Sequence, residues 1–96
     1  MFKEYTRVID FNDCDCRSII DMHKFIKNRL GIPQGYGNGL DALWDIVTGI
    51  MDTPADIMIR GISTLPKDFR EYSKRVVQVF KEAEIMYKGI RVHVDE

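Results

Sequence analysis

The sequence predicts a small α/β domain built on a three-stranded parallel sheet. Short runs of β-forming residues alternate with longer segments whose apolar residues recur every three or four positions, which is typical of parallel strands joined by right-handed helical crossovers. The composition, 45% hydrophobic and 30% charged, is that of an ordinary soluble protein. A length of 96 residues suits a single domain, residues 1–96. No apolar run approaches the roughly 18 residues that a membrane span needs.

The N-terminus and the cysteines favour the cytosol. The first residues, MFKEYTRVIDF, lack the apolar core of a signal peptide, so we expect a cytoplasmic protein. Cys14 and Cys16 are the only cysteines, and a reducing compartment would keep them as thiols. Their CxC spacing suggests a metal, but a structural zinc site needs four ligands and no second Cys/His cluster exists. We therefore expect two loop thiols, with no metal and no cofactor.

The first strand and the first helix follow one another closely. A β-forming run, TRVIDF at residues 6–11, ends at an Asn-Asp turn. Ser18 is the predicted N-cap of a helix that Gly31 terminates. His23 lies on the apolar stripe of this helix, so we expect a hydrogen-bonded core histidine. It would be catalytic only if a nucleophile or an acid converged on it, and the sequence shows no such partner.

A glycine-rich loop, residues 31–39, precedes the second helix. Gly35, Gly37 and Gly39 alternate in the manner of a phosphate-binding loop, but the chain has neither a GxGxxG motif nor a Walker lysine. Asp41 in the first turn of the following helix would also repel a phosphate. The glycines are better explained by turns with positive φ and by the close approach of another surface to the backbone.

The second helix is predicted to begin at an Asn38 N-cap and to end just before Gly49. Asp41 and Asp45 are four residues apart, which places their carboxylates side by side and costs a few tenths of a kcal/mol in an isolated helix. Trp44 lies at the border between this polar arc and the apolar one. The apolar arc holds Leu40, Leu43, Ile46, Val47 and Ile50, and the polar arc holds Asp41, Asp45 and Thr48.

Charge is segregated along the chain. Between Arg29 and Arg60 there is no Lys or Arg, so this span carries four Asp side chains and none of the chain's 14 cations. A charge asymmetry of this kind informs about partners rather than about the fold. The paired carboxylates are either offered to a cationic partner or are simply a solvated helix face.

The C-terminal half predicts two more strands and a long helix. Residues 55–59, ADIMI, are nearly all apolar, which indicates a strand buried on both faces. After an irregular segment with a short helical turn, Pro66 begins a strongly amphipathic helix that runs to about Tyr87. Residues 90–94, IRVHV, form the last strand, and we assign His93 no role. The last helix should pack with the first against one face of the sheet, while the second keeps its acidic arc in solvent.

One stretch resembles a known family. YGxxLDALWD at residues 36–45, followed by Thr48-Gly49, is similar to the signature of the barstar family of ribonuclease inhibitors. VFKEA at residues 79–83 and the order of elements over residues 7–94 also match. The resemblance implies a three-stranded parallel sheet with about four helices and no catalytic residues. It further implies a 1:1 complex with a small, basic, secreted ribonuclease of barnase type, blocked before export, and neither nucleic acid nor a membrane as partner.

The resemblance also implies roles for individual residues. Asp45 would occupy the pocket that holds the substrate phosphate, and Asp41 would pair with basic groups at its rim. Glu82 would add a peripheral charge contact. The expected partner-binding residues are Gly35, Gly39, Leu40, Asp41, Trp44, Asp45, Thr48, Gly49, Ile50 and Glu82.

Four positions depart from the family pattern. Gly35 and Ile50 stand where the best-known member has aromatic side chains, Gly39 replaces an amide, and Met86 replaces an acid. These differences favour a related nuclease or toxin domain as readily as barnase itself.

Two other classes of function fit the acidic helix. Asp41 and Asp45 could serve an enzyme as an acid–base or metal pair, although a third ligand, an oxyanion donor and an enclosing pocket are missing from the pattern. The acidic face could instead belong to an adaptor that binds another basic protein, such as a DNA-binding one.

Overall fold

Three parallel strands form one sheet in a computed structural model that describes residues 5–95. The strands are β1 (Arg7–Asp10), β2 (Ala55–Arg60) and β3 (Ile90–Asp95), adjacent in sequence order. In the register of both parallel pairs, Ile9 lies beside Ile59 and Ile57 beside Val92. The predicted α/β fold with a three-stranded parallel sheet is confirmed.

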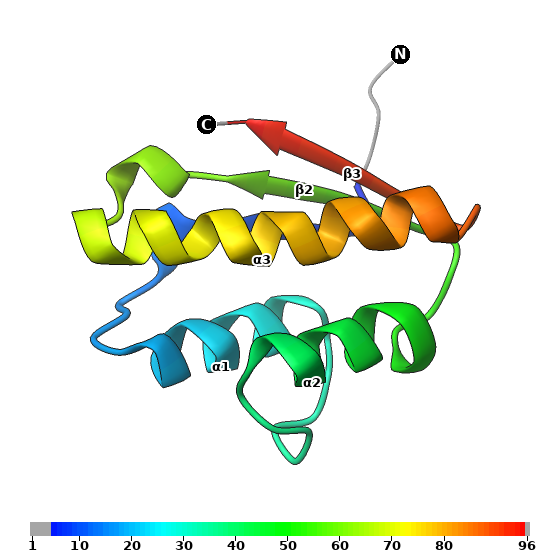
Figure 1. Cartoon of the computed structure of the whole chain (residues 1–96), viewed down its shortest axis with the longest axis horizontal. Coiled ribbons are helices and arrows are strands. Elements are labelled where there is room, and N and C mark those ends of the chain that lie inside the picture. Colours follow the sequence, from blue (N-terminus) through cyan, green and yellow to red (C-terminus); the bar gives the residue numbers. More distant parts are fainter. Residues whose placement is uncertain (1–4, 96) are drawn as a thin grey trace.

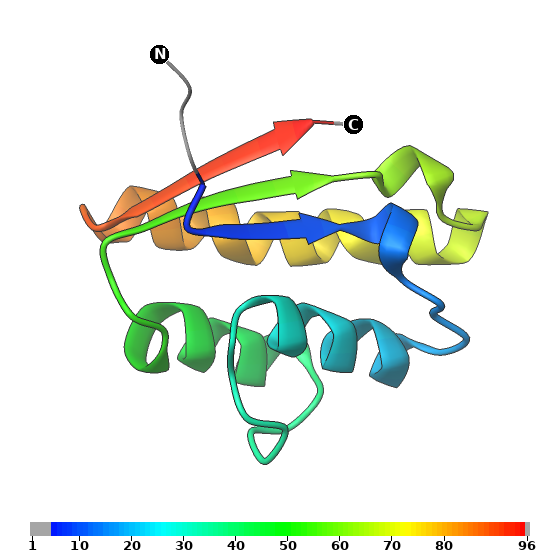
Figure 2. The same cartoon turned by 180° about the vertical axis from the view of Figure 1, so that it is seen from behind.

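Three α-helices connect the strands, where about four helices were expected. They are α1 (Ile19–Arg29), α2 (Leu40–Asp45) and α3 (Lys67–Met86). Short turns complete the chain: the 3₁₀ turns η1 (Phe11–Asp13) and η3 (Ile62–Thr64), and a π-helical turn, η2 (Ile46–Ile50), that continues α2. Figures 1 and 2 show α3 crossing one face of the sheet, with α1 and α2 on the β1 side of α3. None of the helices among residues 5–95 is long and apolar enough to span a membrane.

Within residues 5–95 the helices cover one face of the sheet. In β2 the side chains of Ala55, Ile57 and Ile59 are buried, whereas Met58 is half-buried and Arg60 is exposed. The prediction that this strand is buried on both faces is wrong. With right-handed crossovers and the strand order β1-β2-β3, each connection passes on the same side of the sheet, so the opposite face stays open. On that open face Val8 of β1 remains 41% exposed.

The boundaries of α1 and α3 follow the sequence signals. The Ser18 hydroxyl accepts a hydrogen bond from the Asp21 amide at 3.0 Å, which confirms the predicted N-cap. Gly31, with φ +72°, lies just past the end of α1, in the left-handed conformation that favours glycine. α3 begins at Lys67, one residue later than predicted, because Pro66 is its N-cap and has a non-helical ψ of 153°.

Cys14 and Cys16 differ from the expectation of two separate thiols. The structure places their sulfur atoms in contact, as in a disulfide, with Cα atoms 5.3 Å apart. That separation lies within the range for linked cysteines. One intervening residue in the segment between η1 and α1 is enough to turn both side chains toward each other.

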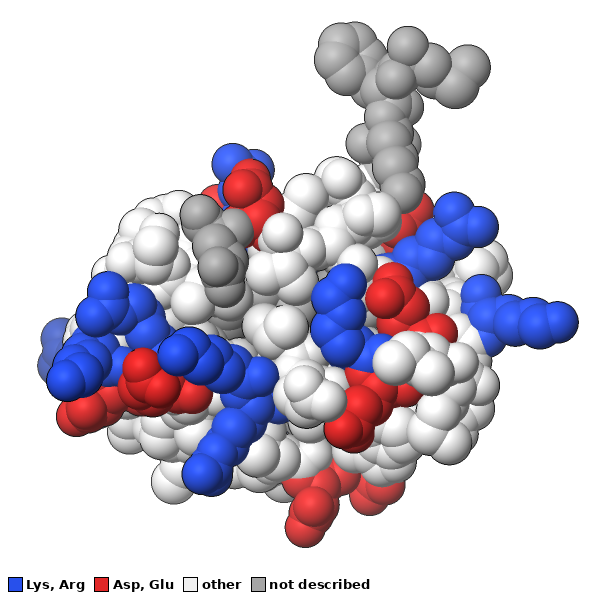
Figure 3. All heavy atoms as spheres, turned by 45° about the horizontal axis from the view of Figure 1, so that its top comes forward, with Lys and Arg blue, Asp and Glu red and all other residues white. Residues whose placement is uncertain are grey.

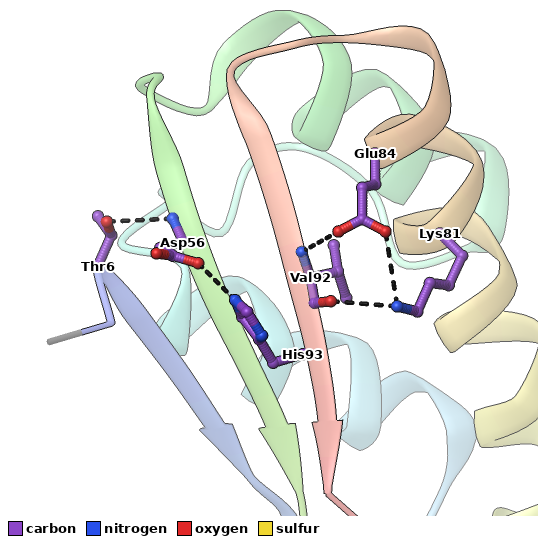
Figure 4. A network of polar contacts seen from close by, with 6 residues as sticks. All are labelled: Thr6, Asp56, Lys81, Glu84, Val92 and His93. Atoms are coloured by element: carbon purple, nitrogen blue, oxygen red, sulfur yellow. Dashed lines mark hydrogen bonds and ion pairs between the residues drawn. The ribbon is translucent and has the colours of Figure 1, made fainter. Parts of the chain in front are cut away.

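Side chains of α3 close the free edge of the sheet (Figure 4). The Val92 amide of β3 donates to Glu84 at 2.6 Å, and the Val92 carbonyl accepts from Lys81 at 3.1 Å. Lys81 and Glu84 also form an ion pair at 3.5 Å. Because an unpaired edge strand is a template for aggregation, these contacts protect β3. On the open face, His93 Nε2 lies 2.7 Å from an oxygen of Asp56.

Candidate binding surface

The helix that carries the acidic residues begins one residue later than predicted. Its N-cap is Gly39, not Asn38, because Gly39 adopts the extended conformation with φ −151° and its carbonyl accepts the first helical hydrogen bond, from Leu43 at 2.9 Å. No side chain caps this end. Asp41, in the first turn, has the sign of charge that suits a helix N-terminus.

The end of this helix also differs from the prediction. The chain does not stop before Gly49 but widens into the π-helical turn η2, in which the Met51 amide donates to the Ile46 carbonyl at 2.8 Å. The wider turn shifts the side chains that follow it. Leu43 and Ile46 are buried as predicted, but Ile50, expected on the buried arc, is 39% exposed. Single π-helical turns are frequent at functional sites.

Asp41 and Asp45 are both exposed on the solvent side of α2. Within residues 5–95 neither carboxylate takes part in a hydrogen bond or an ion pair. The next segment along, η2, contains no cation either. The sequence predicts this exposure, which suits both an acidic pair offered to a partner and a solvated helix face.

Many acids elsewhere on the molecule are paired, in contrast to these two. Glu71 lies 3.3 Å from Lys74, and Asp10 lies 3.7 Å from Arg60. Figure 3 shows acidic and basic side chains next to one another across the sheet side of the molecule. Such surface pairs contribute little stability, but within each pair the charge of the acid is partly offset by a cation of the same chain. The cation-free segment with Asp41 and Asp45 is electrostatically distinct from these pairs.

Three glycines in the loop and helix that carry the acidic pair have no structural need to be glycine. A Cβ atom added to Gly35, Gly39 or Gly49 would meet no other atom within 4 Å, and none of the three has a positive φ. Gly37, by comparison, has φ +64° and a close neighbour. Neither packing nor backbone strain within the chain thus explains the first three. They leave open space over the backbone beside the carboxylates.

The remaining side chains of the segment form a partly apolar border. Trp44 and Leu40 are half-buried and pack against the core, which confirms the border position predicted for Trp44. The Thr48 hydroxyl donates to the Trp44 carbonyl at 2.7 Å. Its proton is therefore used within the chain, and its oxygen can only accept a hydrogen bond from a partner.

Glu82 lies apart from the other predicted site residues. It is an exposed residue of α3, and its carboxylate accepts a hydrogen bond from Gln78 at 2.9 Å. The other nine predicted residues all lie within residues 35–50 of the chain. Glu82 is on the neighbouring helix, which packs beside α2. Met86, further along α3, is 66% exposed.

His23 is a core residue, as the sequence predicts. Its Nε2 lies 2.6 Å from the Tyr72 hydroxyl, and the side chain is buried. Burial lowers the pKa of His23, and the positive charge of Lys27 lowers it further. Burial also raises the pKa of Tyr72, against the opposing influence of Arg75. Among residues 5–95 no cluster of three His, Cys, Asp or Glu side chains could hold a metal ion.

One residue that matters to this surface was not predicted. Lys27 of α1 is buried and its ammonium contacts the glycine-rich loop that leads into α2. Its signal in the sequence is its spacing: Lys27 follows the buried His23 by four residues, so it falls on the apolar stripe of α1.

Comparison with known proteins identifies the family. The model of the family described as Barstar (barnase inhibitor) matches residues 5–95. The chain belongs to the barstar family. A protein of Bacillus subtilis (strain 168) named "Putative ribonuclease inhibitor YrdF" is 32% identical over 78 residues, which cover 81% of this chain and 86% of that protein. Barstar family proteins are inhibitors, so this chain is not an enzyme, and its family implies a ribonuclease as partner.

Proposed function

We propose that this barstar family chain is a cytoplasmic antitoxin that blocks a small, basic, secreted ribonuclease of barnase type, or a related toxin domain, before export. It forms a 1:1 complex in which residues 35–50 cover the nuclease active site. The observation that supports this most strongly is the exposed pair Asp41 and Asp45, which has no cation partner in the described chain.

The chemistry of a nuclease site explains why such a pair would inhibit. A site that binds RNA is lined with cations and attracts polyanions. Asp45 enters the position of the substrate phosphate, and Asp41 pairs with basic groups at the rim. Opposite charges speed the encounter, which matters because free nuclease destroys cellular RNA.

The rest of the segment shapes the contact. Gly35, Gly39 and Gly49 let the nuclease surface approach the backbone, since nothing in the chain occupies the space over them. Three side chains supply apolar contacts: Leu40, Trp44 and Ile50. Thr48 adds an oxygen that accepts a hydrogen bond, and Glu82 adds a peripheral charge.

Three departures from the best-known family member bear on which nuclease is bound. Glycine at 35 and isoleucine at 50 stand where the best-known member has aromatic anchors, and Met86, which is 66% exposed, stands where that member has an acid. With two aromatic anchors and one acid missing, a related nuclease or toxin domain fits this surface as readily as barnase itself.

A panel of small basic ribonucleases, barnase among them, tests the function. Each is titrated with the chain while the cleavage of a fluorogenic RNA is followed. We expect stoichiometric loss of activity with at least one nuclease, and an end point at equal molar amounts. If the chain binds a nuclease but leaves cleavage untouched, it is an adaptor for basic proteins and the proposal is wrong.

A further inference from the structure

Lys27 is a buried cation that reaches from α1 into the loop ahead of α2. Its side chain is 2% exposed. The ammonium donates to the carbonyl of Gly37 at 2.8 Å and to that of Gln34 at 3.3 Å. Among residues 5–95 no carboxylate forms an ion pair with it. Two backbone carbonyls of one loop are thus its hydrogen-bonding partners.

Placing an ammonium here is unfavourable in itself. Burial lowers the pKa of Lys27, and the charge of Lys24 lowers it further. A buried charge without a counter-ion is tolerated only where hydrogen bonds compensate for lost hydration. A methionine would fill a similar space with no charge to desolvate. What the lysine adds over a methionine is therefore its pair of bonds to the loop.

The loop that Lys27 holds belongs to the candidate binding surface. Three further hydrogen bonds attach it to α1: Gln34 Nε2 donates to the Lys24 carbonyl at 3.2 Å, and the amides of Gly31 and Ile32 donate to the carbonyls of Asn28 and Lys27 at 3.1 and 2.9 Å. Residues 33–38 are otherwise exposed, and Gly35 lies among them. A loop with so little packing of its own depends on a few polar contacts for its conformation.

We propose that Lys27 is a positioning residue that holds residues 31–39 in the shape that meets the nuclease. The inference rests on the proposed inhibitory function and adds a buried residue that positions the same surface. Lys27 itself is too deeply buried to touch a partner, so it acts by restricting the loop before binding. A restricted loop loses less conformational entropy when the complex forms.

The test compares Lys27→Met with Lys24→Met, a matched control that removes the same charge from an exposed position one helical turn earlier. We expect Lys27→Met to weaken inhibition on the order of tenfold, mainly through faster dissociation. A purely electrostatic role predicts the opposite sign, because removal of a cation makes the chain more attractive to a basic nuclease. If Lys27→Met binds as tightly as Lys24→Met, or more tightly, the proposal is wrong.

A measurement on the free chain separates this proposal from the proposed function. Amide ¹⁵N relaxation should show lower order parameters at residues 34–38 in Lys27→Met than in wild type and in Lys24→Met, with the strands unchanged. This result can be obtained even if the chain inhibits no ribonuclease. If Lys27→Met does not fold, Lys27→Gln, which keeps a donor of shorter reach, is examined in the same way. An equally ordered loop in the folded variant would overturn the proposal.

Discussion

Replacing Asp45 by asparagine separates binding from folding. The Asp45 carboxylate is exposed and has no hydrogen bond or ion pair within residues 5–95. The amide has the same shape, and its neutrality removes the repulsion from Asp41 four residues earlier. We therefore expect the free energy of unfolding to change by less than about 0.5 kcal/mol, with a slight gain from the lost repulsion.

The same change should be severe in the complex. If Asp45 occupies a cationic phosphate pocket, its neutralisation leaves the cations of the nuclease buried and unpaired. Losing one partner of such a pair typically costs about 2–5 kcal/mol, a range to which the barnase–barstar complex itself contributes measurements. That range corresponds to an increase in Kd of roughly 30-fold to several thousand-fold.

The assay measures the inhibition constant and the association rate at several ionic strengths. Asp45→Asn should associate with a shallower dependence on salt than wild type, since one of the steering charges is gone. Asp95→Asn is the control, because Asp95 is also exposed and is the last residue of β3, a strand that lies on the far side of α3 from α2 in Figure 1. If Asp45→Asn and Asp95→Asn have the same inhibition constant, Asp45 does not act as a phosphate mimic.

Three further substitutions test separate parts of the structure. Gly49→Ala should stabilise the free chain by about 0.5–1 kcal/mol in urea unfolding, since the helical turn gains a side chain without a clash. The same change should weaken inhibition. Unchanged inhibition would show that the partner does not use the open space over Gly49. Glu84→Ala leaves the Val92 amide without its acceptor and should cost about 1–3 kcal/mol in the same assay, whereas an unaltered midpoint would remove Glu84 from the edge of the sheet. Because folding lowers the pKa of His23, the unfolded chain binds a proton at this residue more readily, and wild type loses stability as pH falls below about 6.5. His23→Gln should lose less stability than wild type between pH 7.5 and about 5.5. An equal loss would contradict a buried neutral histidine bonded to Tyr72.

The fold could be predicted from local signals because those signals agree with one another. The Ser18 cap, the glycine after α1 and the apolar stripe of α3 each mark an element that the structure contains. The error at β2 arose because an apolar run does not reveal which face is covered. That depends on the crossovers, all of which pass on one side of the sheet. Met58 is apolar but faces the open side, where it is only half-buried.

The candidate site was predicted in its charges and less well in its backbone. The exposure of Asp41 and Asp45 follows from helical periodicity, which holds over the six residues of α2. The exposure of Ile50 could not be predicted in this way, because a helical wheel assumes a constant angle per residue and the π-helical turn that begins after Asp45 departs from it. Lys27 was missed because a lysine among apolar residues is usually assumed to extend into solvent, and its carbonyl partners exist only in the folded loop.

Competition with a nucleotide measures the central claim most directly. The nuclease is titrated with the chain in the presence of increasing concentrations of a substrate-like mononucleotide that binds the phosphate pocket. Because two ligands of one pocket exclude each other, we predict that the apparent Kd of the chain rises linearly with nucleotide concentration, doubling when the nucleotide half-occupies the pocket of the free nuclease. An apparent Kd that stays constant as the nucleotide saturates the nuclease would contradict the claim that Asp45 takes the place of a phosphate.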